Sequence, residues 1–220
     1  MRGQAMVETL VLLPVILLGV LLVVQLIWLL FATATFRVAV SYSVRAGSLN
    51  HGERAIMERT LTAAMASLEL QFPGATEPQA LELQKLALLA SARQWLHFQL
   101  TGKLQVHRPK AQVMAAEAER RYDLKQQRWV HELAVDHPHT RMAASNDPAT
   151  WQQQRMLDVE VWWCLPLQVP LANRVVAELK NQFASAAQRH CWLRGQIQGK
   201  QYWALEQRLA LPLLSGYRQS

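Results

Sequence analysis

The residues with the clearest potential for chemistry are three histidines and an aspartate that lie close together in the sequence, His131, Asp136, His137 and His139. Neutral imidazoles and a carboxylate are ligands that zinc accepts. Their spacing matches no compact ligand pattern, and two of the histidines flank Pro138 at the start of a polar stretch. Solvated histidines are common in such stretches, so we predict neither a metal site nor a bound cofactor.

Motifs of common enzyme sites are absent from the sequence. It contains no glycine-rich phosphate loop, no nucleophile elbow and no H-E-x-x-H zinc motif. Serines such as Ser145 and Ser215 lie in loop-like contexts without an evident base. We therefore predict that the chain is not an enzyme. A membrane-tethered hydrolase, the alternative, would require a pocket with a paired nucleophile and base.

The two cysteines, Cys164 and Cys191, both follow a long apolar segment. If the chain exports the part beyond that segment, both thiols lie in an oxidising compartment, where disulfides form. A bridge would close a loop of about 28 residues, worth on the order of 3.5 kcal/mol in the chain-entropy description. Two buried free thiols are the alternative.

The apolar segment covers residues 9–36 and contains no charged side chain. Its length of about 28 residues exceeds both the roughly 20 that span a bilayer and the about 7–15 of a cleavable signal peptide. As a helix it would be about 42 Å long, against a hydrocarbon core of roughly 30 Å. We expect a retained anchor whose helix runs on to about Gly47, with Pro14 able to kink its first turns.

Basic residues flank the far end of this segment. Arg37 and Arg45 separate the small residues at 46–47 from the apolar core, so ordinary signal-peptide cleavage there is not expected. Positive charges alone, with Arg37, Arg45 and Arg54 against Arg2 and the N-terminal amine, would leave the orientation undecided or place the far side in the cytoplasm. The N-terminal motif described below demands the opposite orientation, and we follow the motif.

The charge of the chain gives little support to a nucleic-acid partner. Lysine and arginine number 23 and aspartate and glutamate 16, for a formal net charge of +7. Beyond residue 49, 20 basic and 15 acidic groups remain, and they form no dense cluster. Nucleic-acid binding relies on clustered basic side chains, so no such partner is predicted.

Beyond residue 49 the apolar pattern alternates between helical and extended periods. Amphipathic helices are predicted up to a break at residues 72–74 and again over residues 78–98. Another is predicted over about 171–189, with Cys191 after its end. Residues 136–154 hold few apolar side chains, so we expect a long surface loop there.

Strand-like alternation marks four segments, residues 104–107, 129–136, 157–169 and 202–211. We expect them to form one antiparallel sheet. In the third, the odd-numbered residues from Leu157 to Leu167 are apolar and share one face, while the other face is mixed. The predicted fold class is α+β, with a long N-terminal transmembrane helix followed by helices and an antiparallel sheet.

Tryptophan is abundant, with eight residues, and Trp162, Trp163, Trp192 and Trp203 fall in the final third of the chain. Alternation along a strand places Trp162 and Trp163 on opposite faces. Both can be buried only if something covers the second face. That cover is either the predicted helix 171–189 or a partner subunit.

The N-terminus has a distinctive sequence, Arg2-Gly3-Gln4-Ala5-Met6-Val7-Glu8, directly before the apolar run. It looks like the class III signals that prepilin peptidases cut after glycine. Leu13-Pro14 and Val44-Arg45-Ala46-Gly47 further resemble the TadE-like branch of pseudopilins, whose members show G-x-x-x-V-E, a leucine-proline step and an R-x-G turn. The resemblance is strong over about the first 47 residues and weak beyond them.

This resemblance implies a pilin-like organisation. Residues 1–3 would be a short leader, residues 4–49 a transmembrane and pilin-like helix, and residues 50–220 a periplasmic α+β domain. The N-terminus would be cytoplasmic and the protein a single-pass component of the inner membrane, or of the extracellular pilus. Its partners would be the prepilin peptidase, other pilin or pseudopilin subunits, the pilus assembly machinery and membrane lipid.

The resemblance also implies roles for single residues. Cleavage after Gly3 would make Gln4 the first residue and Glu8 the fifth. A carboxylate at the rim of an apolar helix costs several kcal/mol unless it finds a partner, and the family implies that Glu8 pairs with the Gln4 amine of a neighbouring subunit. A hydrated Glu8 at the membrane interface is the alternative.

The sequence is therefore consistent with two functions of different class. The first is a minor pseudopilin, a structural or assembly component of a tight-adherence type IV pilus. The second is an uncut, single-pass anchor that carries a periplasmic binding or sensing domain. Processing after Gly3 distinguishes them.

Overall fold

The computed structural model describes residues 2–69, 80–169, 171–182 and 185–218, with the side chains of these residues except 2–11 and 80. The fold is mixed, as predicted, with a long apolar N-terminal helix followed by helices and antiparallel sheets. The helices are α1 (Arg2–Leu49), α2 (Arg54–Met65), the 3-10 turn η1 (Ala66–Leu68), α3 (Ala80–Thr101), α4 (Ala111–Glu117), α5 (Pro138–Ala144), α6 (Pro148–Gln154), α7 (Ala172–Gln182) and α8 (Ala186–Gln198). The strands are β1 (Lys103–Arg108), β2 (Ala118–Asp123), β3 (Arg128–Leu133), β4 (Met156–Pro166) and β5 (Tyr202–Pro212).

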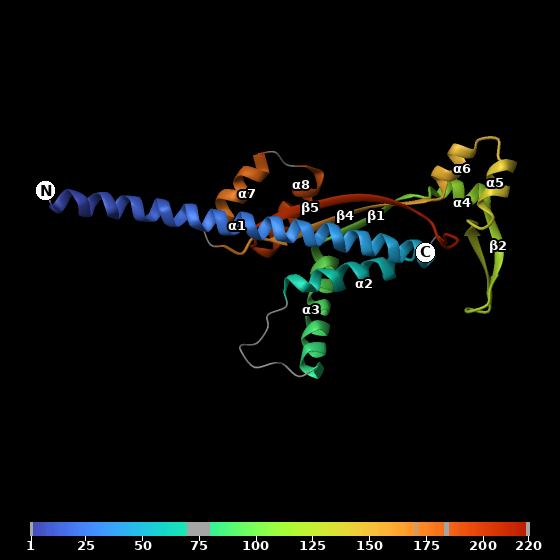
Figure 1. The fold of residues 1–220 in the computed structure, drawn as a ribbon, viewed down its shortest axis with the longest axis horizontal. Coiled ribbons are helices and arrows are strands. Elements are labelled where there is room, and N and C mark those ends of the chain that lie inside the picture. The colour runs from blue at the N-terminus through green and yellow to red at the C-terminus, as the bar shows by residue number, and fades with distance from the viewer. Residues whose placement is uncertain (1, 70–79, 170, 183–184, 219–220) are drawn as a thin grey trace. The chain divides into compact units, whose positions relative to one another are not determined.

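Two compact units divide the chain. The first comprises Met1–Phe36 and Trp162–Leu205, and the second comprises Arg37–Val161 and Glu206–Ser220. Helix α1 and strands β4 and β5 each contribute residues to both. Figure 1 shows the first unit with α7 and α8, in orange, beside the middle of α1.

Helix α1 is continuous over 48 residues and contains Pro14. The Arg45-Ala46-Gly47 segment, which the family pattern led us to expect as a turn, is still helical. The turn follows it, where the Gly52 N–H donates to the Gly47 carbonyl over 2.9 Å. Gly52 has a φ of 74°, a left-handed conformation that glycine adopts without strain. The helix therefore ends at Leu49, two residues beyond the end expected at about Gly47.

The core of the second unit forms where α1, α2 and β4 meet. The Ser43 hydroxyl of α1 donates to the Met57 carbonyl of α2 over 2.8 Å. Gly47 of α1 faces the side chains of Met57 and Leu157, and both of these are fully buried. Helix α2 packs in turn on α3. Gly47 thus permits a close approach between α1 and its neighbours.

Strands β1, β4 and β5 form one sheet in that order. The Leu167 N–H donates to the Gln201 carbonyl beyond one end of the β4–β5 pair, and the Leu213 N–H donates to the Arg155 carbonyl beyond the other. These two bonds show that β4 and β5 run antiparallel. The apolar face predicted for β4 is confirmed, since Leu157, Val159 and Val161 are fully buried.

The prediction of a single sheet is wrong for residues 129–136. Strand β3 pairs with β2 in a separate antiparallel hairpin whose register runs from Ala118 opposite Leu133 to Asp123 opposite Arg128. Strand β2 was not predicted. Its sequence, Ala-Glu-Arg-Arg-Tyr-Asp, is mostly charged, so apolar alternation could not reveal it.

Two helical predictions are also corrected. The helix expected over 171–189 is two helices, and Cys191 lies inside α8 instead of after a helix end. Helix α8 begins at the cap Ser185, whose hydroxyl accepts from the Gln188 N–H over 3.2 Å. The loop expected over 136–154 contains α5 and α6, each with proline in its first turn. Proline is common in the first turn of a helix. The two helices were not predicted because they contain few apolar residues.

Candidate functional site

The burial of the α1 side chains increases toward Gln25, after the half-buried Leu18, Leu21 and Leu22. None of the described side chains from Leu12 to Val24 is buried. From Gln25 onward, side chains on one face of the helix are buried at a spacing of three or four residues: Gln25, Leu29, Ala32, Phe36, Ala39, Val40, Ser43, Val44, Gly47 and Ser48. This spacing is that of a helix face packed against a folded partner. We call the part of α1 before Gln25, whose side chains are described from Leu12 on, the unpacked half, and the remainder the packed half.

Gln25 is the first fully buried side chain of α1 among the described residues. Its side chain is fully buried, and its Oε1 accepts from the Val169 N–H over 3.1 Å. The Gln25 Nε2 and the Trp28 Nε1 have no acceptor among the described residues. Burying an amide with an unmade hydrogen bond costs stability. The contact with Val169 is thus the physical role that we can assign to this glutamine.

The part of α1 before Gln25 is by itself as long as the apolar core of a membrane is thick. Helix α1 is long and apolar enough to cross a membrane, and residues 4–24 as a helix measure about 31 Å at 1.5 Å per residue. The hydrocarbon core is roughly 30 Å thick. The predicted span of residues 9–36 was longer because apolar sequence continues into the packed half. Packing, and not hydropathy, separates the two halves.

The three residues that the N-terminal motif singles out lie within helix α1. They are Gly3, Gln4 and Glu8. Their side chains lie outside the described residues, so no geometry can be given for the predicted cleavage position or the predicted charge pair. Both stay predictions from the sequence.

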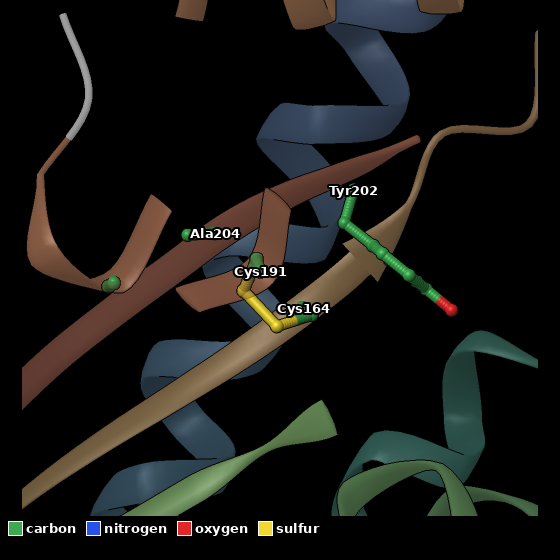
Figure 2. Packing of buried hydrophobic residues seen from close by; sticks show 5 residues of the cluster. Cys164, Cys191, Tyr202 and Ala204 are labelled. Atoms are coloured by element: carbon green, nitrogen blue, oxygen red, sulfur yellow. A yellow bond between two sulfur atoms is a disulfide. The ribbon is translucent and has the colours of Figure 1, made fainter. Parts of the chain in front are cut away.

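The structure contains the predicted disulfide between Cys164 of β4 and Cys191 of α8, with an S–S distance of 1.99 Å. Figure 2 shows the bridge between the strand and the helix. Both cysteines are fully buried, in a cluster with Ala187, Tyr202 and Ala204. The alternative of two free thiols is therefore excluded in this structure.

Helix α8 also supplies the cover expected for the second face of β4. Trp162 packs against the buried cluster around the disulfide and lies 5.8 Å from His190 between ring centroids. Trp163, on the opposite face, is only 1 % exposed. The two tryptophans are thus accommodated within the chain, one fully and one partly buried.

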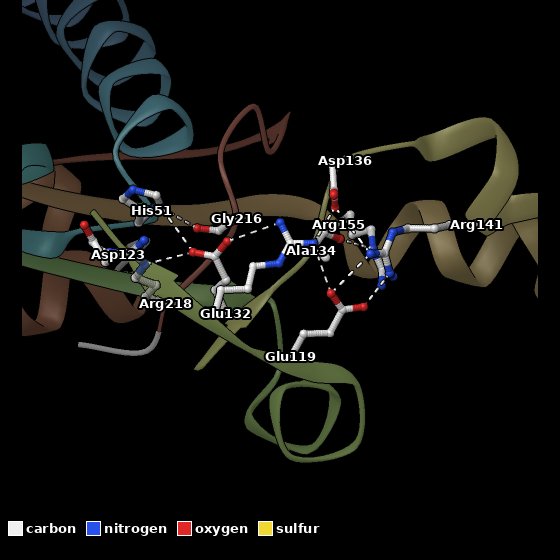
Figure 3. A network of polar contacts seen from close by, with 11 residues as sticks. His51, Glu119, Asp123, Glu132, Ala134, Asp136, Arg141, Arg155, Gly216 and Arg218 are labelled. Atoms are coloured by element: carbon white, nitrogen blue, oxygen red, sulfur yellow. Dashed lines mark hydrogen bonds and ion pairs between the residues drawn. The ribbon is translucent and has the colours of Figure 1, made fainter. Parts of the chain in front are cut away.

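A network of charged side chains in the second unit was not predicted (Figure 3). Arg218 near the C-terminus contacts Asp123 of β2 and donates to Glu132 of β3 over 3.0 Å. Arg121 donates to Asp136 over 2.8 Å and to Glu119 over 3.0 Å. The β2 sequence mixes acidic and basic residues, but apart from the pair of Arg121 with Glu119 these bonds join residues 15 to 95 positions apart. Sequence pattern alone could not pair them.

Hydrogen bonds and charges in this network lower the pKa values of its carboxyl groups, which favours their ionised forms. Hydrogen bonds from Arg141 and then Arg121 lower the pKa of Glu119. The Gln126 backbone N–H, followed by Arg218, lowers the pKa of Asp123 to about 2. Ionised, mutually bonded groups of this kind do not resemble a base held near neutral pH. The network therefore holds the hairpin and the C-terminal segment in place.

The residues considered for metal binding do not converge. Asp136 is paired with Arg121 and, at 3.5 Å, with Arg141, while His131, His137 and His139 are exposed. Among the residues that the structure describes, no three histidine, cysteine, aspartate or glutamate side chains are placed to hold a metal ion.

Comparisons with known proteins give no relative for this chain. No family matches it, and no curated protein or solved structure is significantly similar to it. Its function must be inferred from the division of α1 and from the residues at its N-terminus.

Proposed function

We propose that this protein is a minor pseudopilin of TadE type, a structural or assembly subunit of a tight-adherence type IV pilus. Its N-terminus would be cytoplasmic, the first half of α1 would lie in the inner membrane, and the α+β domain would be exported. The observation that carries the proposal is the division of one continuous helix at Gln25, with an unpacked apolar half followed by a half packed on the domain by one face.

The outer face of the packed half supports association with other helices. Beyond Gln25, α1 still exposes large apolar side chains on the face turned away from its own domain: Leu26, Ile27, Leu30, Phe31, Val38 and Tyr42. A simple anchor needs apolar side chains only where it meets lipid. Apolar side chains that continue alongside the folded domain fit a helix that packs between the helices of neighbouring subunits.

Glu8 would control this association through its charge. In the processed protein the Gln4 amine of a neighbouring subunit would offer it a positive partner, and an unpaired carboxylate in an apolar setting is costly. Removing the carboxylate should therefore weaken assembly without altering the exported domain.

Processing provides the first experiment. The full chain is expressed with and without its host's prepilin peptidase, and intact mass is measured. We expect loss of residues 1–3 and a new N-terminus at Gln4 only when the peptidase is present. Gly3→Ile should block the cut, whereas Gly19→Ala, in the same helix, should not. An uncut chain, or a cut elsewhere, would remove the main support for the proposal.

Assembly provides the second experiment. Glu8→Gln keeps the size of the side chain and removes its charge, so crosslinking to neighbouring pilin subunits should fall. Glu53→Gln, an exposed position at the start of α2, is the matched control. Unchanged crosslinking in Glu8→Gln would refute the charge-pairing role.

A second function is favoured by the outer face of α3. This helix packs on α2 but exposes seven large apolar side chains: Leu81, Leu83, Leu88, Leu89, Trp95, Leu96 and Leu100. Exposed apolar patches of this kind mark interaction sites. They fit an anchored binding domain, the function that an unprocessed N-terminus would support instead.

A further inference from the structure

Helix α7 of the first unit carries an exposed apolar stripe. Leu171, Val175 and Leu179 follow one another at a spacing of four residues, and Leu171 and Leu179 are 62 % and 57 % exposed. The adjoining face of α7 is packed, because Ala172, Val176 and Ala177 are buried. The stripe is therefore a second apolar face, separate from the one that holds α7 in the unit.

The backbone at Leu171 is held in an unusual conformation. Its φ is 65°, a left-handed value that is uncommon and costly for residues with a side chain. This strain does not serve burial, since the leucine is more than half exposed. Its carbonyl accepts from the Val175 N–H over 3.5 Å, so this conformation belongs to the start of α7.

The stripe lies next to the point where α1 becomes unpacked. Val169, two residues before Leu171, donates its N–H to Gln25, the residue at which the unpacked half of α1 ends. In Figure 1, α7 runs across the direction of α1. If α1 spans a membrane with residues 4–24, the membrane surface lies near Gln25, and α7 runs along that surface.

We propose that α7 rests on the surface of the membrane that α1 spans, with Leu171, Val175 and Leu179 inserted among the lipids. An amphipathic helix that lies in the interface plane buries its apolar face at the boundary of headgroups and acyl chains. The inference rests on the membrane anchor of the proposed function, but not on its role in a pilus.

Charge favours anionic phospholipid as the occupant. Residues 162–205 contain five basic side chains and a single acidic one, Glu178. The basic ones are Arg174, Lys180, Arg189, Arg194 and Lys200. Basic segments next to a bilayer are attracted by anionic headgroups over about a Debye length. The apolar stripe and the charge around it thus favour the same partner.

The second helix of this unit adds to the same surface chemistry. Helix α8 exposes Trp192, Leu193 and Ile197. Tryptophan is enriched at the boundary between membrane and water, because its ring is apolar and its N–H is polar. The first unit therefore exposes apolar side chains on two helices.

The anchor explains why a membrane is preferred to a protein partner. Helix α1 holds α7 beside the lipid surface in every copy of the protein, so the effective concentration of lipid at the stripe is high. A single weak interfacial contact then suffices, because the transmembrane helix already provides stable attachment. Any soluble protein would have to displace this contact.

The test uses the full chain in vesicles of equimolar phosphatidylethanolamine and phosphatidylglycerol. The described residues contain no free cysteine, so Leu179→Cys can be labelled with an environment-sensitive dye. Leu124→Cys, 86 % exposed in the turn of the β2–β3 hairpin, reports water. Val15→Cys, 64 % exposed on the unpacked half of α1, reports the anchor.

We expect doxyl lipid to quench the dye at positions 179 and 15, and aqueous iodide to quench it at position 124. Val175→Glu in the same chain should expose position 179 to iodide. Replacing phosphatidylglycerol by neutral phosphatidylcholine should lower the ratio of inserted to free label about fivefold for each basic side chain engaged.

Three results would overturn the inference, and they are distinguishable. If iodide quenches position 179 as freely as position 124 while position 15 is quenched by lipid, the anchor stands and α7 does not touch the membrane. Protection of position 179 from both quenchers would mean that protein covers the stripe. If position 15 escapes the lipid quencher, the membrane anchor itself fails. The cut after Gly3 is measured separately, so its failure leaves this inference standing.

Discussion

Replacing Gly47 by alanine tests how closely α1 approaches the domain that it carries. A Cβ at this position would lie 2.5 Å from Met57 Sδ, 2.7 Å from Met57 Cγ and 3.1 Å from Leu157 Cδ2. The Met57 side chain is flexible, but it is fully buried, as is that of Leu157. The added methyl therefore forces movement in a packed core.

Two opposing effects set the expected magnitude. Alanine stabilises a helix interior by about 0.5–1 kcal/mol relative to glycine. Overpacking a well-packed core costs about 1–3 kcal/mol. The cost of overpacking exceeds the gain in helix propensity, so Gly47→Ala should lower the free energy of unfolding by about 1–2 kcal/mol. Gly19→Ala is the matched control, since nothing lies within 4 Å of its new Cβ, and it should show no such loss.

The assay is urea unfolding of the full chain in mild detergent, followed by tryptophan fluorescence, with the free energy taken at unchanged denaturant slope. The double variant Gly47→Ala/Met57→Ala adds a stringent step. Removing the Met57 side chain makes room for the new methyl. The double variant should therefore lose less stability than the sum of the two single variants, with a coupling energy of about 0.5–3 kcal/mol. A wild-type midpoint for Gly47→Ala, or strictly additive losses, would refute the close approach.

Two further predictions concern the disulfide and the charged network. Cys164→Ser/Cys191→Ser should lose about 2–4 kcal/mol of stability in the same assay, and dithiothreitol should then destabilise the wild type but not the variant; equal sensitivity to reductant would contradict it. The pKa of Asp123 is lowered from 3.8 to about 2, so its carboxylate stabilises the fold above about pH 4 and this contribution is lost as the pH falls through about 2. Asp123→Asn should flatten the pH dependence of unfolding between these values, and an unchanged slope in a pH series would count against the network.

Several features could be predicted from the sequence because local composition controls them. An uncharged run is visible without knowledge of packing, and so is the alternation that made β4 recognisable. The pairing of Cys164 with Cys191 could be predicted because the chain has only two cysteines. The residues at the N-terminus, Gly3, Gln4 and Glu8, belong to the sequence alone, and their roles stay predictions.

Other features depended on contacts between distant residues. The hairpin of β2 and β3 is held by ion pairs such as Arg218 with Asp123 and Glu132, and no local pattern shows which charges meet. The break between α7 and α8 could not be predicted from the apolar periodicity either, because that pattern does not show that Ser185 caps a new helix.

The sequence by itself determined that α1 is long, apolar and continuous enough to cross a membrane. Only the tertiary structure decided where its unpacked half ends, at Gln25, and which face of the remainder is buried. The physical reason is that a helix with apolar side chains on all sides suits lipid and a protein core equally well. Contacts with residues far along the chain, beginning with Val169, choose between them.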